Sequence, residues 1–140
     1  MDVRKWIIPV SLIVFTISLC FNAFKVIEVE EIKAYSSLEI LLVGPVSFLG
    51  GGIFEFFIWT ANIWFLIALI FIYKKQSYSK AFILGLIATV ISISFLFWKE
   101  ILIAENGRQG KIYSLEAGYF LWLTSFLFLT ICSFFFNYKI

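Results

Sequence analysis

Four long stretches of this 140-residue chain contain no charged side chain. They lie between Lys5 and Lys25, Glu55 and Lys74, Lys80 and Lys99, and Glu116 and Lys139, and each has 18 to 22 residues. An α-helix needs about 20 residues to cross the roughly 30 Å hydrocarbon core of a bilayer. We therefore expect four membrane-spanning helices.

The overall composition argues against a globule folded in water. Hydrophobic residues make up 62% of the chain and charged residues 14%, whereas soluble domains have about 45–50% and about 25%. In lipid, every backbone polar group must be bonded within the protein, which favours helices. The predicted fold class is therefore all-α: an integral membrane protein built as an antiparallel bundle of four transmembrane helices.

The predicted helices and their loops form one domain over residues 1–140. Helices are expected at about 6–24, 53–73, 81–98 and 115–136, with outer loops at about 25–52 and 99–114. Loop 25–52 begins with alternating apolar and acidic residues, which fit an extended strand and an interfacial helix equally poorly. Its second half, LEILLVGPVSFLG, is too short to span and is broken by Gly44-Pro45. We expect that half at the membrane interface or dipping into the protein.

Basic residues predict the orientation in the membrane. The short connection KKQSYSK (74–80) carries three lysines and no acid, and short basic connections stay on the cytoplasmic side. Two crossings separate this connection from the N-terminus, so both ends of a multi-pass protein of the inner (plasma) membrane are expected inside. A cleaved signal peptide is the alternative for the first apolar run, but its length and Phe21 near the only plausible cleavage site favour a retained anchor.

The residue types exclude several kinds of chemistry. The chain has no histidine, which removes the commonest metal ligand and the usual general base. It shows no nucleophile–base pair, phosphate-binding loop, metal-ligand spacing or nucleic-acid signature. Cys20 and Cys132 are expected near opposite membrane faces, too far apart for a disulfide. We therefore predict a non-enzyme without metal, cofactor or nucleic-acid partner, although carboxylate chemistry at the outer loops stays open.

Polar residues of the second predicted helix are the first candidates for a site. Glu55, Trp59 and Asn62 fall on one helix face. Glu55 lies in the first turn, where the helix dipole favours a carboxylate; alternatively, it pairs with Arg108, whose guanidinium can hold a carboxylate through two hydrogen bonds. Asn62 lies deeper in the membrane and is expected to bond to another helix.

The outer loops supply further charged candidates for a site that binds an ion, a small molecule or a lipid head group. The candidate binding residues are Glu55, Trp59, Asn62, Glu100, Glu105, Arg108 and Glu116. Small residues on the third helix instead predict a packing face, because they let a neighbouring backbone approach closely. These small residues are Ala81, Gly85, Ala88, Thr89 and Ser92.

Four segments carry a resemblance to known sequences: LEILLVGP (38–45), WTANIWFLIAL (59–69), AENG (104–107) and AGYFLWLTS (117–125). With them the chain resembles a family of small, uncharacterised bacterial integral membrane proteins with four predicted helices. The resemblance implies residence in a bacterial inner membrane and no known activity. This chain departs from the family in having Ile63 where a proline commonly follows the asparagine. The motif positions are Glu39, Leu41, Leu42, Gly44, Trp59, Ala61, Asn62, Gly118, Tyr119, Leu121, Trp122 and Leu123.

Three functions stay open from the sequence. The leading hypothesis is a non-catalytic membrane protein that acts by association with itself or with a membrane-protein partner. The alternative is binding or transport of a lipid, small molecule or ion at the outer acidic and basic cluster. The third, suggested by size alone, is an immunity or defence-associated membrane protein.

Overall fold

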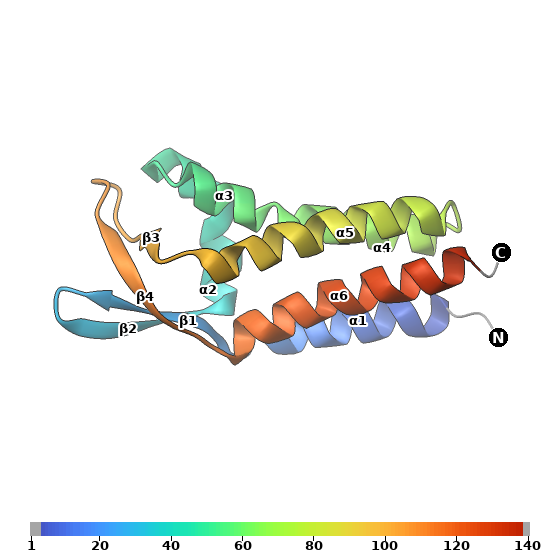
Figure 1. Ribbon diagram of the computed structural model, residues 1–140, viewed down its shortest axis with the longest axis horizontal. Coiled ribbons are helices and arrows are strands. Elements are labelled where there is room, and N and C mark those ends of the chain that lie inside the picture. The colour runs from blue at the N-terminus through green and yellow to red at the C-terminus, as the bar shows by residue number, and fades with distance from the viewer. Residues whose placement is uncertain (1–3, 139–140) are drawn as a thin grey trace.

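The computed structural model describes residues 4–138, so Lys139, which bounds the fourth charge-free stretch, lies outside it. Helices form a long bundle, and a four-stranded antiparallel sheet lies at one end of it (Figure 1). The start of α1, the end of α6 and the α4–α5 turn lie at the opposite end. In chain order the elements are α1 (Arg4–Ser18), β1 (Asn22–Glu28), β2 (Glu31–Ser36), α2 (Ser37–Val43), the 3₁₀ helix η1 (Gly44–Gly50), α3 (Ile53–Trp59), α4 (Ala61–Tyr73), α5 (Tyr78–Ser94), the 3₁₀ helix η2 (Phe95–Phe97), β3 (Glu100–Leu102), β4 (Gln109–Leu115) and α6 (Ala117–Asn137).

The prediction of an all-α fold with four transmembrane helices is wrong. The structure is mixed α/β, 66% helical with a four-stranded sheet. Within the described residues, three helical segments are long and apolar enough to cross a membrane: Ile53–Tyr73, Tyr78–Phe97 and Ala117–Asn137. The helix predicted at 6–24 ends at Ser18 instead, and the chain enters β1 at Asn22.

The last two residues of the first charge-free stretch, Ala23 and Phe24, are buried in protein although they lie beyond the helix. Phe24 is 6% exposed, and its ring packs against Phe95 and Tyr35 with centroids 5.5 and 5.6 Å apart. In the sheet Phe24 pairs with Tyr35 of β2 and Leu115 of β4. A strand with neighbours on both sides satisfies its backbone hydrogen bonds as a helix does. The apolar residues after Ser18 therefore do not need to be part of a helix.

The sheet is built from two β-hairpins, one from each predicted outer loop. The strand order is β2-β1-β4-β3. Successive side chains of β1 alternate between the protein interior and the surface, since Val26 is fully buried whereas Ile27 is exposed. Gly110 on β4 allows the hairpins to approach, because a Cβ at this position would lie 2.3 Å from Cγ1 of Val26. The alternation at the start of loop 25–52 thus belongs to an extended strand.

The tip of the β1–β2 hairpin holds two residues in an unfavourable backbone conformation. Val29 and Glu30 have φ values of 45° and 74°, the pattern of a type I′ turn, which prefers Asn-Gly. This conformation costs a residue with a Cβ roughly 1–2 kcal/mol. We expect the double variant Val29→Asn/Glu30→Gly to stabilise the hairpin by about 1–2 kcal/mol.

Hydrogen–deuterium exchange of peptides from β1 and β2 measures this effect, with slower exchange expected in the double variant. Ile32→Asn is the control, because it replaces an exposed apolar side chain of β2 without changing the turn. Equal exchange in the double variant and the wild type would contradict the prediction.

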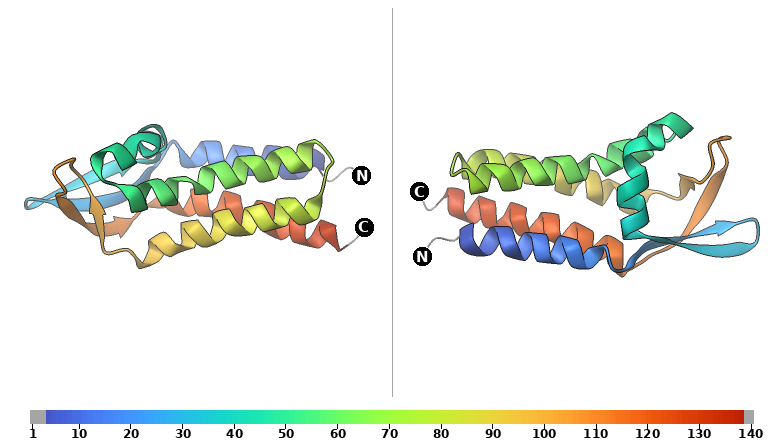
Figure 2. Two further views of the ribbon diagram at one scale, coloured as in Figure 1. Left: turned by 90° about the horizontal axis from the view of Figure 1, so that it is seen from above. Right: turned by 180° about the vertical axis from the view of Figure 1, so that it is seen from behind.

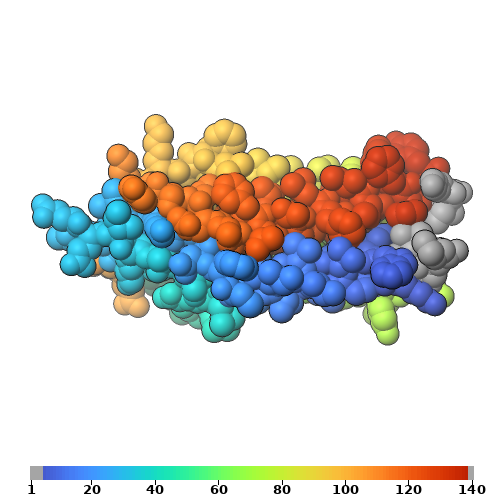
Figure 3. All heavy atoms as spheres, turned by 90° about the horizontal axis from the view of Figure 1, so that it is seen from below, coloured from blue at the N-terminus to red at the C-terminus, as the bar shows by residue number. Residues whose placement is uncertain are grey.

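The bundle places α1 beside α6, α6 beside α5, and α5 beside α4 (Figure 2). Figure 3 shows α1 (blue) and α6 (orange to red) side by side along the molecule. Rings of Phe15, Phe65 and Phe126 fill the centre, with the Phe65 and Phe126 centroids 4.7 Å apart. Cys20 and Cys132 are both free thiols.

The small residues predicted on the third helix lie on the buried face of α5. A Cβ at Gly85 would lie 2.7 Å from Oγ1 of Thr130 on α6. The hydroxyls of Thr89 and Thr130 are hydrogen-bonded at 3.1 Å between the same two helices. This face of α5 therefore packs against α6.

Candidate functional site

A cavity of about 390 Å³ lies where the sheet meets the helices, and we call it the junction cavity. Its walls come from the end of α1, from the strands β1, β2 and β3, from the segment α2–η1, from α3, α4 and η2, and from the start of α6. Its polar lining residues are Lys33, Tyr35, Ser37, Glu39, Ser47, Glu55 and Asn62, and its aromatic lining residues include Phe15, Phe24, Trp59, Phe95, Tyr119 and Trp122.

The C-terminal end of α1, which comes earlier in the chain than predicted, borders the junction cavity. Phe15 and Leu19, at the last turn of α1 and just beyond it, line the junction cavity opposite Ile58 of α3. Past this point the chain turns into β1, and α2 runs across the bundle axis (Figure 2).

Most motif positions of the family resemblance meet at this cavity. The lining includes residues from three of the four segments, namely Glu39, Leu41, Gly44, Trp59, Asn62, Gly118, Tyr119 and Trp122. The fourth segment, AENG (104–107), lies in the β3–β4 turn and contributes no lining residue. Segments that are far apart in the sequence therefore surround one space.

Trp59 fixes the wall formed by α2 and η1. Its indole N–H donates to the carbonyl of Leu41 at 3.0 Å. Gly44 makes room for the ring, because a Cβ there would lie 2.1 Å from Cδ1 of Trp59. The segments LEILLVGP (38–45) and WTANIWFLIAL (59–69) are thus in direct contact.

Asn62 joins two helices. Its side-chain oxygen accepts from the indole N–H of Trp122 on α6 at 2.7 Å, and its amide nitrogen donates to the carbonyl of Trp59 at 2.9 Å. Asn62 is 6% exposed, so both of these hydrogen bonds are shielded from water. The structure therefore places Asn62 in the interhelical role.

Removing this contact is expected to weaken the bundle modestly. Hydrogen bonds between membrane helices contribute about 0.6 kcal/mol on average and up to about 1.7 kcal/mol, so Asn62→Leu and Trp122→Phe should each destabilise the protein by about that amount. A double-mutant cycle in detergent measures the coupling. Full additivity of the two substitutions would show that the contact contributes nothing.

Glu55 binds the sheet rather than an arginine. One of its carboxylate oxygens accepts from the backbone N–H of Leu102 on β3 at 2.9 Å. Arg108 is exposed in the β3–β4 turn, where its own backbone N–H donates to the side chain of Asn106. Among the described residues no ion pair joins Glu55 to Arg108, so that predicted alternative is not formed. Instead, Glu55 is half-buried and lines the junction cavity.

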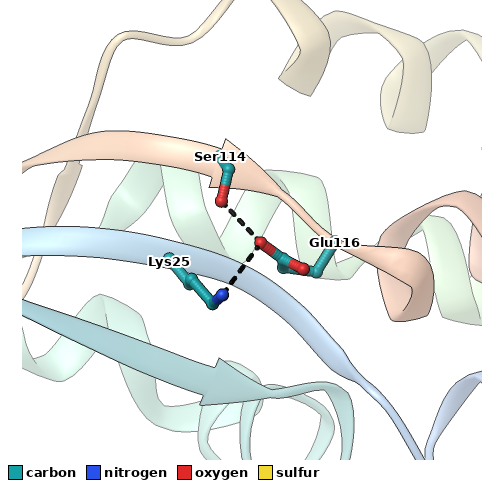
Figure 4. A network of polar contacts seen from close by, with 3 residues as sticks. All are labelled: Lys25, Ser114 and Glu116. Carbon is teal, nitrogen blue, oxygen red and sulfur yellow. Dashed lines mark hydrogen bonds and ion pairs between the residues drawn. The ribbon is translucent and has the colours of Figure 1, made fainter.

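The other charged candidates do not assemble with Glu55. Glu100, Glu105 and Arg108 are exposed on β3 and the following turn, and none of them lines the junction cavity. Glu116 accepts from the Ser114 hydroxyl at 2.5 Å and pairs with Lys25 at 3.6 Å (Figure 4). The predicted outer cluster is therefore divided between separate places.

The contacts of Glu116 predict a pH effect. The hydrogen bond from Ser114, with a smaller contribution from the charge of Lys25, holds the pKa of this carboxyl below its ordinary value of 4.5. A lowered folded-state pKa adds stability above the ordinary pKa and loses it as the pH falls through the lowered value. We expect Glu116→Gln to destabilise slightly at neutral pH and to match the wild type in acid.

Thermal unfolding in detergent between about pH 7 and pH 3 tests this expectation, since the interval brackets the carboxyl pKa. Glu105→Gln, at an exposed site in the β3–β4 turn, is the control. A Glu116→Gln variant whose deficit persists in strong acid would contradict the assignment.

Sequence reasoning missed the residues of β2 that line the junction cavity. The Tyr35 hydroxyl donates to the Glu28 carboxylate, and burial together with that carboxylate raises the pKa of Tyr35. Tyr35 therefore remains a neutral donor. The start of the adjacent α2 had a usable signal: Ser36 accepts from the backbone N–H of Glu39, as the Ser-x-x-Glu pattern of a helix N-terminus predicts.

Neither family models, curated proteins nor solved structures match this chain. The resemblance to a bacterial membrane family thus stays a prediction.

Proposed function

We propose that this protein is an integral membrane protein that binds a small amphipathic or apolar molecule in the junction cavity. The volume of about 390 Å³ supports the proposal, because ligand pockets typically have about 300–1,000 Å³. Its lining is mainly aromatic and aliphatic with a few convergent polar groups, which is also typical of such pockets. The proposal keeps the ligand-binding hypothesis but moves the site from the outer charged cluster to the junction.

Membrane placement favours a lipid-like guest. With the lysines of the α4–α5 turn in the cytoplasm, the sheet would lie outside and the junction cavity at the outer boundary of an inner membrane. The segment α2–η1 has exposed apolar side chains, including Leu42, Val46 and Leu49, which suit contact with lipid. An amphiphile in the outer leaflet would have direct access to that level of the protein.

We propose binding rather than catalysis. Among the described residues, no group of three or more histidine, cysteine or acidic side chains could hold a metal ion. The junction cavity presents carboxylates, an amide, hydroxyls and one lysine without a nucleophile held by a base. These groups can hold and orient a guest through hydrogen bonds and charge.

Filling the junction cavity tests the proposal. Ile58→Trp places a larger side chain in its wall, whereas Ile63→Trp makes the same change at a position of α4 that is exposed and outside the lining. Proteins purified in mild detergent would be extracted and the bound amphiphiles identified by mass spectrometry. We expect the wild type and Ile63→Trp to retain a common amphiphile and Ile58→Trp to lose it.

A second variant protects the test against misfolding. Val43→Trp lies in the lining at a half-exposed position at the end of α2, so it narrows the cavity without entering the core. Unfolding temperatures establish that each variant is folded. A wild-type protein that carries no amphiphile from native membranes, or folded cavity variants that carry as much as the control, would rule out the proposal.

Association is the second candidate function. β2 is an edge strand of the sheet, and an edge offers unpaired backbone groups to another chain. Crosslinking in native membranes and blue-native electrophoresis test it, with Lys33→Pro in β2 expected to reduce any complex. A monomer throughout would count against association. The defence hypothesis has no support from any contact described above.

A further inference from the structure

We infer that the junction cavity selects an amphiphile with a primary ammonium head group over one with an anionic head group. The inference rests on the proposed binding function and adds the chemistry of the preferred guest. It depends on three features of the lining: its charge, its unused hydrogen-bonding groups and its aromatic faces.

The charge of the lining is net negative. Glu39 of α2 and Glu55 of α3 line the junction cavity, and Lys33 is its one basic lining residue. The Lys33 ammonium lies 5.0 Å from the centre of the Tyr35 ring, on the exposed strand β2. A head group of net negative charge would thus meet two like charges and one opposite charge, whereas a terminal ammonium would meet two opposite charges and one like charge.

The hydrogen-bonding groups point the same way, because the indole and phenol donors of the lining are already used. The N–H groups of Trp59 and Trp122 donate to Leu41 and Asn62. The Tyr35 hydroxyl donates to Glu28. These three groups have no hydrogen left for an anionic guest.

Hydrogen-bond acceptors of the lining, in contrast, are still available to a guest. Among the described residues, Glu39 receives no hydrogen bond on its carboxylate, and Glu55 receives one, on a single oxygen. An ammonium brings three donors and no acceptor, which matches this surplus of acceptors.

Aromatic faces complete the argument. Trp59 and Trp122 line the junction cavity with their N–H edges turned to protein acceptors. The faces of such rings attract a cation, and tryptophan attracts it best. The same rings offer apolar contact to the acyl chain of the guest. One lining can therefore hold both parts of an ammonium lipid.

Competition between two phospholipids tests the inference. Detergent-solubilised protein would be mixed with equal amounts of dioleoyl phosphatidylethanolamine and dioleoyl phosphatidylglycerol, and lipid adducts would be counted by native mass spectrometry. We expect about tenfold more phosphatidylethanolamine, which corresponds to about 1.4 kcal/mol, the scale of a single charge-assisted hydrogen bond. The double variant Glu39→Gln/Glu55→Gln should bring the ratio near one.

The double variant is designed to keep the fold. A glutamine at position 55 can still accept from the Leu102 N–H, and Glu39 is exposed. Glu100→Gln/Glu105→Gln is the matched control, because it removes the same charge from the sheet end outside the cavity. The control should keep the wild-type ratio.

The outcomes separate this inference from the proposed function. Equal binding of both lipids, a preference for phosphatidylglycerol, or an equal loss of preference in both double variants would overturn the ammonium inference while leaving cavity binding intact. If Ile58→Trp and Val43→Trp bind both lipids as the wild type does, the cavity is not the site and both proposals fail.

Discussion

The variant Gly118→Ala is expected to lose about 2–3 kcal/mol of stability, near the upper end of what overpacking costs. A Cβ at position 118 would lie 2.2 Å from Oγ of Ser37, 2.6 Å from the carbonyl oxygen of Asn22 and 2.9 Å from its carbonyl carbon. Two of these atoms belong to the backbone and cannot rotate away. The strand β1 or the start of α6 would have to shift.

The helix propensity of alanine acts in the opposite direction, but it is too small to restore the stability of Gly118→Ala. Alanine is favoured over glycine in a helix by about 1 kcal/mol, and Gly118 lies in the first turn of α6, where the gain is smallest. Unfolding in detergent, followed by circular dichroism, measures the net loss. Ala117→Leu is the control, because it enlarges the neighbouring, exposed position and should change little.

A rescue experiment identifies the contact that is responsible. Ser37→Ala removes the nearest atom, Oγ, but leaves the Asn22 carbonyl in place. The double variant Ser37→Ala/Gly118→Ala should therefore recover part of the stability and not all of it. Wild-type stability in Gly118→Ala alone would mean that the close approach of β1 and α6 does not exist in the protein.

The second large effect is expected from Phe126→Ala. Phe126 is fully buried, and its ring centre lies 4.7 Å from that of Phe65 and 4.8 Å from that of Trp122. Replacing a buried phenylalanine by alanine costs about 3–5 kcal/mol in soluble proteins. We expect the lower end, about 3 kcal/mol, because in the proposed membrane setting separated helices would remain in an apolar solvent and only packing would be lost.

Phe120→Ala provides the matched comparison on the same helix. Phe120 is 48% exposed, so its removal deletes the same atoms without opening a cavity in the core. Unfolding of both variants in the same detergent measures the difference. Equal losses would show that the centre of the bundle is not packed around Phe126.

Phe126→Ala also tests the connection between the core and the site. Trp122 contacts both Phe126 and the junction cavity, so a space beside its ring lets the indole move. Lipid binding should weaken in Phe126→Ala at temperatures where the protein is still folded. It should stay at the wild-type level in Phe120→Ala.

Parts of the site could be read from single positions and parts could not. Asn62 could be assigned to an interhelical contact because a lone amide in an apolar helix needs a partner. Its partner, Trp122, could not be identified, since the last apolar stretch offers several side chains with N–H or O–H groups, among them Tyr119, Trp122 and Ser125. Gly44 and Gly118 could be identified only as positions of the family resemblance. The atoms that leave no room for a Cβ at these positions belong to other segments of the chain.

The pairing of Glu55 shows a different limit. Its place in a first helical turn followed from the order of residues alone. Its partner is a backbone N–H of β3. Because nearly every residue has a backbone N–H, the sequence does not show which one is the partner. A charge-based search therefore pointed to Arg108, the arginine expected on the same side of the membrane, whose guanidinium can hold a carboxylate through two hydrogen bonds.

By itself, the sequence determined the lengths of three helices that are long and apolar enough to cross a membrane, because a charge in hydrocarbon is costly and therefore marks where such a segment ends. The tertiary structure alone decided where the first helix ends, which loops pair as a sheet, and that a cavity remains between them. The physical reason is that lipid and protein interior are both apolar. A residue such as Phe24 satisfies either environment, so only the contacts of Phe24 with Tyr35 and Phe95 show which one surrounds it.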